Sequence, residues 1–182
     1  PAHPLFDRAL MTSYPPGSTF KPTQGLILLQ EGIITTGTAY PCHHGYISGR
    51  LRVGCHSHAS PLALKPALQT SCNAFFCYGF KAMIDRRSKY GNSANAFEVW
   101  KKHLVSMGYG YRLGIDLPGE SRGFIPNDRF YNKIYGKGHW SANTIISVSI
   151  GQGEIGATPV QIANLCATIA NRGWFITLSL IH

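Results

Sequence analysis

Residues 14–22, YPPGSTFKP, decide how this chain folds and where its chemistry is placed. Two prolines and a glycine precede Ser18, and they cannot extend a helix on the N-terminal side. The apolar run LILL follows at residues 26–29, so we predict a helix that begins at Ser18 and ends near Gly32. Ser18 and Lys21 then lie one turn apart on the same helix face. This spacing predicts a hydroxyl nucleophile next to an amine base.

The helix start suits acyl transfer. A side chain at the first turn lies beside backbone N–H groups that have no intrahelical acceptor and that stabilise a developing negative charge. Lys21 can act as a base near neutral pH only if its pKa falls by about three units from about 10.4, which corresponds to about 4 kcal/mol. The alternative is that Ser18 caps the helix and Lys21 is a solvated side chain.

Further motifs follow in a fixed order. The motifs Ser-x-x-Lys, Ser-x-Asn and Lys-Thr-Gly together mark penicillin-binding proteins and serine β-lactamases. After YPPGSTFKP this chain has SCN at 71–73 followed by AFF, GIDLPGE at 114–120, GQG at 151–153 and ATPVQ at 157–161. Over nearly all of its length, the chain therefore resembles a class B penicillin-binding protein. It is most similar to the elongation-type, rod-shape peptidoglycan D,D-transpeptidase.

The resemblance implies roles for four residues. Ser18 matches the acylated serine, and Lys21 matches the lysine that accepts its proton. Ser71 matches the serine that relays the proton to the leaving amine. Asn73 matches the asparagine whose carboxamide holds the substrate amide.

Three Ser-x-Asn triplets occur, beginning at Ser71, Ser93 and Ser141. We assign the motif to Ser71 because a helical stretch precedes it and an aromatic run follows it, as in the family. Ser93 instead lies in a polar segment that we expect to be a loop.

The third motif departs from the family pattern. KG at 137–138 lacks the hydroxyl residue and precedes GQG, whereas the family has its third motif downstream. We therefore expect residues 1–182 to be a partial transpeptidase domain, without the membrane anchor, the pedestal domain and the Lys-Thr-Gly strand. The expected fold is α+β, a fragment of the serine transpeptidase/β-lactamase-like fold that is helix-dominated with an incomplete antiparallel sheet. Alone, it is expected to be inactive.

The expected function is cross-linking of peptidoglycan stem peptides through an acyl-enzyme, at the periplasmic face of the inner membrane. The implied partners are the stem peptide, β-lactam antibiotics and the cell-wall elongation machinery, and no organic cofactor is implied. One alternative is a serine β-lactamase or β-lactam sensor domain. A class A hydrolase needs a Glu-x-x-x-Asn run, and none of the glutamates is followed by Asn at that spacing.

Charge favours an anionic partner or surface. Lys and Arg outnumber Asp and Glu by nine. The basic residues are scattered, with short pairs such as RR at 86–87 and KK at 101–102, and they form no stripe along one helix. This pattern argues against nucleic acid as the partner.

Cysteine and histidine residues cluster at two places. Cys42 and Cys55 flank a glycine-rich segment that is typical of a small hairpin, which would bring the two thiols together. Three outcomes are open: a Cys42–Cys55 disulfide, a structural zinc site that adds His56 or His58, or free cysteines. In the zinc case a second alternative function arises, a zinc-stabilised binding module in which Ser18 only caps a helix.

The remaining segments predict a mostly helical chain. We expect Cys72 and Cys77 to be small buried apolar residues. Predicted elements are a hairpin within 33–58, a helix opening at Ser60 with Pro61 at its first position, helices at 74–84, 96–107 and 158–171, polar or irregular segments at 86–95 and 110–140, and a strand at 174–181.

Overall fold

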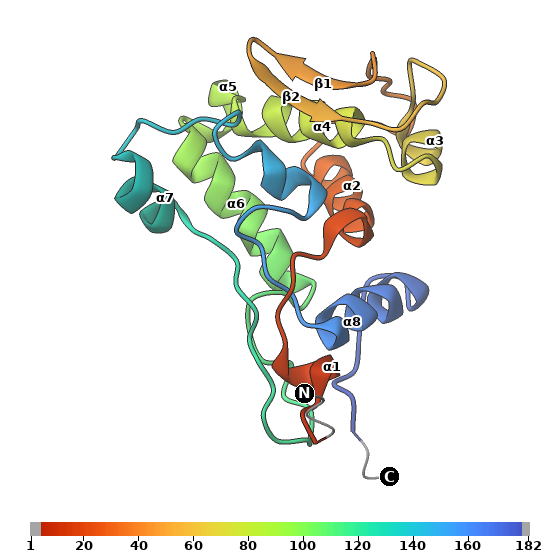
Figure 1. Ribbon diagram of the computed structural model, residues 1–182, viewed down its shortest axis with the longest axis vertical. Coiled ribbons are helices and arrows are strands. Elements are labelled where there is room, and N and C mark those ends of the chain that lie inside the picture. Colours follow the sequence, from red (N-terminus) through yellow and green to blue (C-terminus); the bar gives the residue numbers. More distant parts are fainter. Residues whose placement is uncertain (1–4, 180–182) are drawn as a thin grey trace.

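The computed structural model describes residues 5–179, and most of its regular structure is helical (Figure 1). In chain order the elements are α1 (Arg8–Met11), the 3-10 helix η1 (Gly17–Phe20), α2 (Lys21–Gln30), β1 (Gly45–Ser48), β2 (Leu51–Gly54), α3 (Leu64–Gln69), α4 (Asn73–Ile84), α5 (Arg87–Tyr90), α6 (Ser93–Ser106), α7 (Asp128–Tyr135), the 3-10 helix η2 (Ile146–Ile150) and α8 (Pro159–Ala170). The predicted class, helix-rich α+β with a small antiparallel sheet, is confirmed. Within 5–179, none of the helices has the length and apolarity that a bilayer crossing requires.

Helix α4 forms the centre of the core. It packs against α2, β1, α6 and η2, which surround it. Its buried apolar side chains lie on almost every face: Ala74, Phe75, Phe76, Cys77, Phe80, Met83 and Ile84. Each large side chain that is fully buried contributes about 1.5–3 kcal/mol to stability. The continuous apolarity of this segment is therefore explained by a central position in the fold.

The two-stranded sheet lies over α4 (Figure 1). β1 and β2 pair antiparallel with Tyr46 opposite Val53, and Tyr46 is buried with its ring centroid 4.8 Å from that of Tyr78 on α4. Gly45 has no room for a side chain, because a Cβ there would lie 2.2 Å from the carbonyl oxygen of Val53. The strands are therefore held tightly together at the end where Gly45 faces Gly54.

Several predicted boundaries were wrong. The Ser60–Pro61 peptide bond is cis, and α3 begins only at Leu64, so Pro61 does not occupy a first helical position. Pro66 lies in the first turn of α3, where its missing N–H is not needed.

Segments expected to be irregular also contain helices. The 86–95 segment contains α5 and the start of α6, which the Asn92 side chain caps. The 110–140 segment contains α7, capped by Asn127. Residues 174–179 form no strand, and positions 180–181 of that prediction lie outside the described residues.

The last helix begins where the sequence predicts. The Thr158 side chain accepts from the Gln161 N–H while the Gln161 side chain accepts from the Thr158 N–H, which completes a capping box. On the other side of α8, Ile169 is 44% exposed and Cys166 is exposed.

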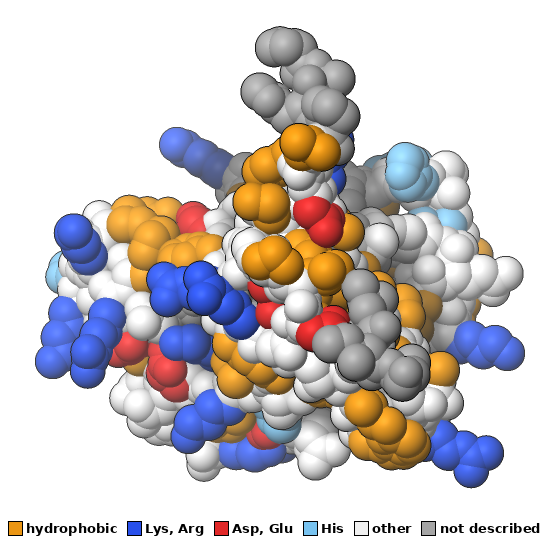
Figure 2. Space-filling view, turned by 90° about the horizontal axis from the view of Figure 1, so that it is seen from below, with side chains coloured by type: hydrophobic (Ala, Val, Ile, Leu, Met, Phe, Trp, Pro, Cys, Tyr) orange, Lys and Arg blue, Asp and Glu red, His pale blue; other side chains and the backbone are white. Residues whose placement is uncertain are grey.

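Charged groups are dispersed on the surface. On the face shown in Figure 2, Lys and Arg side chains occupy several separate places, with Asp and Glu between some of them. That face carries no continuous basic stripe.

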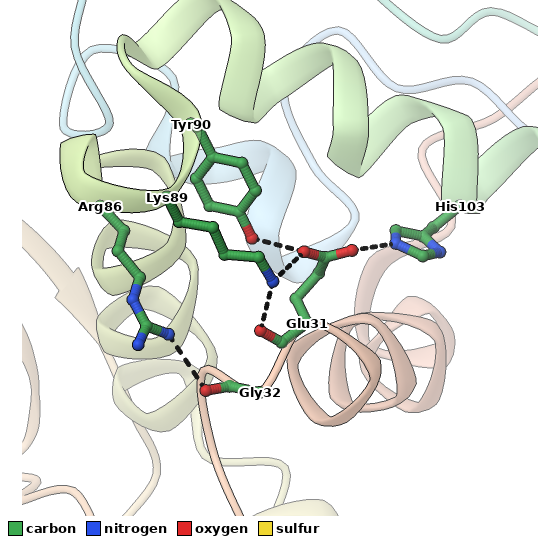
Figure 3. Close-up of polar contacts among 6 residues, drawn as sticks. All are labelled: Glu31, Gly32, Arg86, Lys89, Tyr90 and His103. Carbon is green, nitrogen blue, oxygen red and sulfur yellow. Dashed lines mark hydrogen bonds and ion pairs between the residues drawn. The ribbon is translucent and has the colours of Figure 1, made fainter.

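A polar cluster fixes the C-terminal end of α2 (Figure 3). The Glu31 carboxylate accepts from Lys89 Nζ, from the Tyr90 hydroxyl and from His103 Nε2, each at 2.6 Å. Lys89 also donates to the Glu31 carbonyl oxygen at 2.8 Å. These contacts tie α2 to α5 and α6, and the Lys89 ammonium meets the negative end of the α2 dipole.

Glu31→Gln is expected to reduce the free energy of unfolding at pH 7 by about 2 kcal/mol. Partial burial acts to raise the pKa of Glu31, but hydrogen bonds from Lys89, Tyr90 and His103 outweigh it and lower the pKa to about 2. Because the folded-state pKa lies below the ordinary value of 4.5, this stabilisation is present above about pH 4.5 and is lost as the pH falls towards 2. Urea unfolding of the natural protein and of Glu31→Gln at several pH values measures this contribution to the free energy of unfolding.

Asp85→Asn is the matched control. Asp85 forms an exposed pair with Lys81 on α4, so its loss should cost about 0.5 kcal/mol or less. Equal losses in both variants at pH 7 would contradict a special role for the Glu31 cluster.

Candidate active site

Ser18 lies in the tight turn that precedes α2. It belongs to η1 and its side chain is exposed, so a carbonyl group can approach it from solvent. Gly17 before it has a left-handed backbone, φ +57°, and its N–H donates to the Gly151 carbonyl oxygen at 2.7 Å. The turn is therefore attached to the segment that follows η2.

Lys21 is the first residue of α2 and is 2% exposed. Its Nζ lies 3.1 Å from Ser18 Oγ, 2.8 Å from Ser71 Oγ and 2.6 Å from the Ser71 carbonyl oxygen. Ser71 Oγ in turn lies 2.9 Å from Ser18 Oγ. Three side chains that are up to 53 positions apart in the sequence thus form one closed set of hydrogen bonds.

Burial lowers the pKa of Lys21 below its ordinary value, and this effect exceeds the opposing influence of Cys55, Cys72 and Cys77. An uncharged amine has two N–H groups and one lone pair. It can donate to both Ser71 oxygens while it accepts the Ser18 hydroxyl proton, and the Ser71 hydroxyl then donates to Ser18 Oγ. When Lys21 is uncharged, as base catalysis requires, each side-chain N–H and O–H group of Lys21, Ser18 and Ser71 donates one hydrogen bond, and the Lys21 lone pair accepts one.

Ser71 connects α3 to α4 and adopts a left-handed backbone, φ +54°, which is uncommon for a residue with a side chain. This conformation directs both its carbonyl oxygen and its hydroxyl to Lys21. A strained residue held in place by its surroundings is typical of functional sites.

Asn73 opens α4 next to Ser71 and is partly exposed. Its Nδ2 donates to the Gly54 carbonyl oxygen at 2.7 Å, so the hairpin fixes the orientation of the carboxamide. Oδ1 is then the atom available to accept from a ligand N–H. The other Ser-x-Asn triplets lie elsewhere, since Ser93 begins α6 and Ser141 contacts Thr144.

The backbone of Gly151 also contributes to the site. From the sequence, roles were assigned to Ser18, Lys21, Ser71 and Asn73 and none to Gly151. It has φ +71°, and a Cβ there would lie 2.4 Å from the Gly17 carbonyl oxygen and 2.5 Å from Phe20 Cβ. Only glycine fits such a position. The contribution of Gly151 could have been predicted from the sequence, because GQG at 151–153 is one of the motifs shared with the family.

A second cluster lies directly behind the Ser-x-Asn segment. The ligand atoms of Cys42, Cys55, His58 and Cys72 all lie within 4.8 Å of one another. The structure thus places His58, and not His56, with the thiols. Cys72 is buried as predicted, and its sulfur also belongs to this cluster.

His58 is oriented as a ligand would be. Its Nδ1 lies 2.7 Å from the Ala59 carbonyl oxygen, which can only accept, so Nδ1 carries the proton. Nε2 is then an unprotonated nitrogen, and it is buried without a hydrogen-bond partner. Three thiols and one imidazole are a donor set that suits tetrahedral zinc.

The penicillin binding protein transpeptidase domain matches residues 2–182 of this chain. The chain belongs to this family. As a penicillin-binding protein transpeptidase domain it has relatives among the rod-shape class B proteins: it is 34% identical over 176 residues to the peptidoglycan D,D-transpeptidase MrdA of Acinetobacter baumannii, an alignment that covers 93% of this chain and 24% of that protein. The chain therefore spans about a quarter of that relative's length.

Solved structures of this family have the same fold. Penicillin-binding protein 2 of Pseudomonas aeruginosa, in complex with WCK 5153, superposes with a TM-score of 0.81 at 24% identity over 97% of this chain and 38% of that one. Penicillin-binding protein 2 of Helicobacter pylori, in complex with MreC, superposes with a TM-score of 0.81 at 26% identity over 97% of this chain and 31% of that one.

Proposed function

We propose that this transpeptidase domain performs the acylation chemistry of a serine D,D-transpeptidase that cross-links peptidoglycan stem peptides. The observation that carries the proposal is the buried Lys21 amine, which contacts both the exposed Ser18 hydroxyl and Ser71. Family membership supports the reaction class. Because this chain spans about a quarter of the A. baumannii relative, the activity is proposed for the protein in a form with the complete domain.

In the proposed reaction, Ser18 Oγ attacks the carbonyl carbon of a D-Ala-D-Ala stem peptide as Lys21 takes the hydroxyl proton. The tetrahedral intermediate collapses when that proton passes through Ser71 to the leaving amine, and D-alanine departs. An amine of a neighbouring strand then attacks the ester carbonyl, the bond between the acyl group and Ser18 Oγ breaks, and the proton lost by the amine returns to Ser18 Oγ, which leaves the cross-link as an amide and the serine free. Asn73 holds the substrate amide through Oδ1.

The proposed setting is the periplasmic face of the inner membrane, within the cell-wall elongation machinery. The H. pylori relative that was solved with MreC supports an elongation partner of this kind. We further propose that residues 1–182 need the Lys-Thr-Gly strand for activity, because the loss of one oxyanion donor costs about 3–4 kcal/mol of transition-state stabilisation.

Incubation of the full-length protein with a penicillin tests the proposal. Intact mass and peptide mapping should find one adduct, on Ser18, that persists for many minutes. Ser141→Ala, in a Ser-x-Asn triplet away from Lys21, should acylate normally. Rapid repeated turnover of a chromogenic β-lactam would favour the β-lactamase alternative, and the absence of any adduct on Ser18 would remove the proposal.

We also propose a structural zinc ion at Cys42, Cys55, His58 and Cys72. When bound, the ion would hold the hairpin against the start of α4 by joining residues from both. Metal analysis of protein purified under reducing conditions should find about one zinc per chain. A zinc content near zero, with unchanged stability after chelation, would exclude the ion.

A further inference from the structure

A polar groove of about 780 Å³ lies at the C-terminal end of α4, where Asp85 borders it. The rest of its wall comes from α5, the start of α6, α7 and residues 137–141. Its volume is within the range of about 300–1,000 Å³ that is usual for ligand sites. We propose that this groove binds the glycan strand that carries the stem peptide. The inference rests on the proposed transpeptidase activity, because it adds a second contact with the same substrate.

The side chains that line the groove indicate the chemical class of its ligand. Two carboxylates, Asp85 and Asp128, balance the positive charges of Arg87 and Lys137. Nucleic acids and other polyanions bind surfaces with a surplus of positive charge, which this groove lacks. The uncharged lining residues are mostly Asn, Ser and Gly, so the groove also offers little apolar surface to a hydrophobic side chain. A neutral oligosaccharide, whose hydroxyl and acetamido groups both donate and accept hydrogen bonds, fits this lining.

Three asparagine side chains of the groove are held in fixed orientations by the protein. Asn92 Oδ1 accepts from the Asn95 backbone N–H at 2.9 Å, and Asn95 Nδ2 donates to the Tyr90 carbonyl oxygen at 3.0 Å. Asn132 Oδ1 accepts from Trp140 Nε1 at 2.9 Å. Within residues 5–179, the other amide atom of each side chain has no hydrogen-bond partner. Two Nδ2 donors and one Oδ1 acceptor are therefore preorganised for a ligand.

The groove and the candidate active site are connected along one side of α4. Ser141 borders the groove, and from there the chain passes through η2, which packs against α4 (Figure 1). It then reaches Gly151, whose carbonyl oxygen accepts from the Gly17 N–H in the turn that carries Ser18.

The length of α4 matches the reach of a short peptide. The helix has 12 residues, from Asn73 beside the candidate active site to Ile84 next to the groove, and is therefore about 18 Å long. An extended peptide of about five residues covers the same distance. A stem peptide whose sugar lies in the groove can therefore present its far end to Ser18, and the groove would hold the glycan strand while the peptide reacts.

Binding of chitotetraose, a neutral tetramer of N-acetylglucosamine, to the full-length protein tests the inference. Isothermal titration calorimetry should detect saturable binding. Hydrogen–deuterium exchange of the natural protein should slow, when the sugar is bound, in peptides that contain residues 91–95 and 137–141. Chitotetraose has no peptide that Ser18 could attack, so its binding is measured separately from acylation.

The double variant Asn92→Asp/Asn132→Asp removes both Nδ2 donors from the groove. It keeps the Oδ1 acceptors, so α6 retains its cap and Trp140 retains its partner. The loss of two hydrogen bonds should weaken chitotetraose binding about tenfold or more. Asn127→Asp is the matched control, because Asn127 caps α7 in the same way but does not border the groove, and its affinity should equal that of the natural protein.

Three results would each overturn the inference: no saturable binding of chitotetraose, an affinity that the double variant leaves unchanged, or slowed exchange only in other parts of the protein. If the double variant does not fold, the exchange experiment on the natural protein carries the test. A protein that binds the sugar in the groove but is never acylated on Ser18 by a penicillin would instead remove the proposed function. The two failures are distinguishable because sugar binding and acylation are measured independently.

Discussion

Lys21→Met is expected to reduce the rate of acylation of Ser18 by a β-lactam about 10³-fold or more. The amine is the group in contact with the Ser18 hydroxyl that can accept its proton, and removal of a positioned base costs about 10²–10⁴-fold. Methionine retains much of the buried volume, so the helix is expected to stay folded. Stopped-flow or quenched acylation assays on the full-length protein measure the rate.

The dependence of the acylation rate on pH shows whether Lys21 acts as a base or only packs in the core. Acylation by the natural protein should rise with pH as Lys21 loses its proton. Because burial lowers the pKa of Lys21, the rise should be centred below the ordinary value of 10.5. The residual rate of Lys21→Met should lack this step. Lys81→Met, which removes an exposed lysine of α4, should leave both the rate and the profile unchanged. A Lys21→Met variant with an undiminished rate would contradict the role of this amine.

Gly151→Ala is expected to produce the second largest effect, a fall of about 10²-fold in acylation rate. The added Cβ would lie 2.4 Å from the Gly17 carbonyl oxygen and 2.5 Å from Phe20 Cβ, so the turn that carries Ser18 must move. The left-handed backbone adds a further cost of about 1–2 kcal/mol to stability.

Gly138→Ala is the control that separates the effect of the steric contact at Gly151 from the effect of placing a side chain on a left-handed backbone. Gly138 also has a positive φ, +78°, but nothing lies within 4 Å of a Cβ placed there. Both variants should therefore lose stability, while Gly151→Ala alone should lose acylation. Equal acylation rates in the two variants would show that the Gly151 contact does not position Ser18. Thermal unfolding measured in parallel gives the stability of each.

The part of the site that depends on local spacing could be predicted from the sequence. Ser18 and Lys21 lie one turn apart, so the helix period alone brings them together. Ser71 is 50 positions from Lys21, and no local rule relates the two. Its assignment depended on the order of motifs along the chain, and the hydrogen bonds of Lys21 agree with the choice of Ser71 over Ser93 and Ser141.

Features that arise from tertiary packing could not be predicted. Cys72 was expected to be a small buried apolar residue, and nothing near it in the sequence indicates that Cys42, Cys55 and His58 fold onto it. The Glu31 cluster joins three helices and has no sequence motif. α7 was missed because its segment is rich in Gly, Tyr and Asn, and the Asn127 cap that fixes its start is a single side chain.

The burial of α4 limits how the sequence next to Ser71 and Asn73 can vary. The helix begins at Asn73 and buries apolar side chains on almost every face, so a substitution that moves Asn73 through this helix also disturbs the core. Core changes of this kind cost about 1–5 kcal/mol, a large part of the stability of a typical domain. Tolerated substitutions near Ser18 should therefore arise at exposed positions such as Thr19 and be rare along α4.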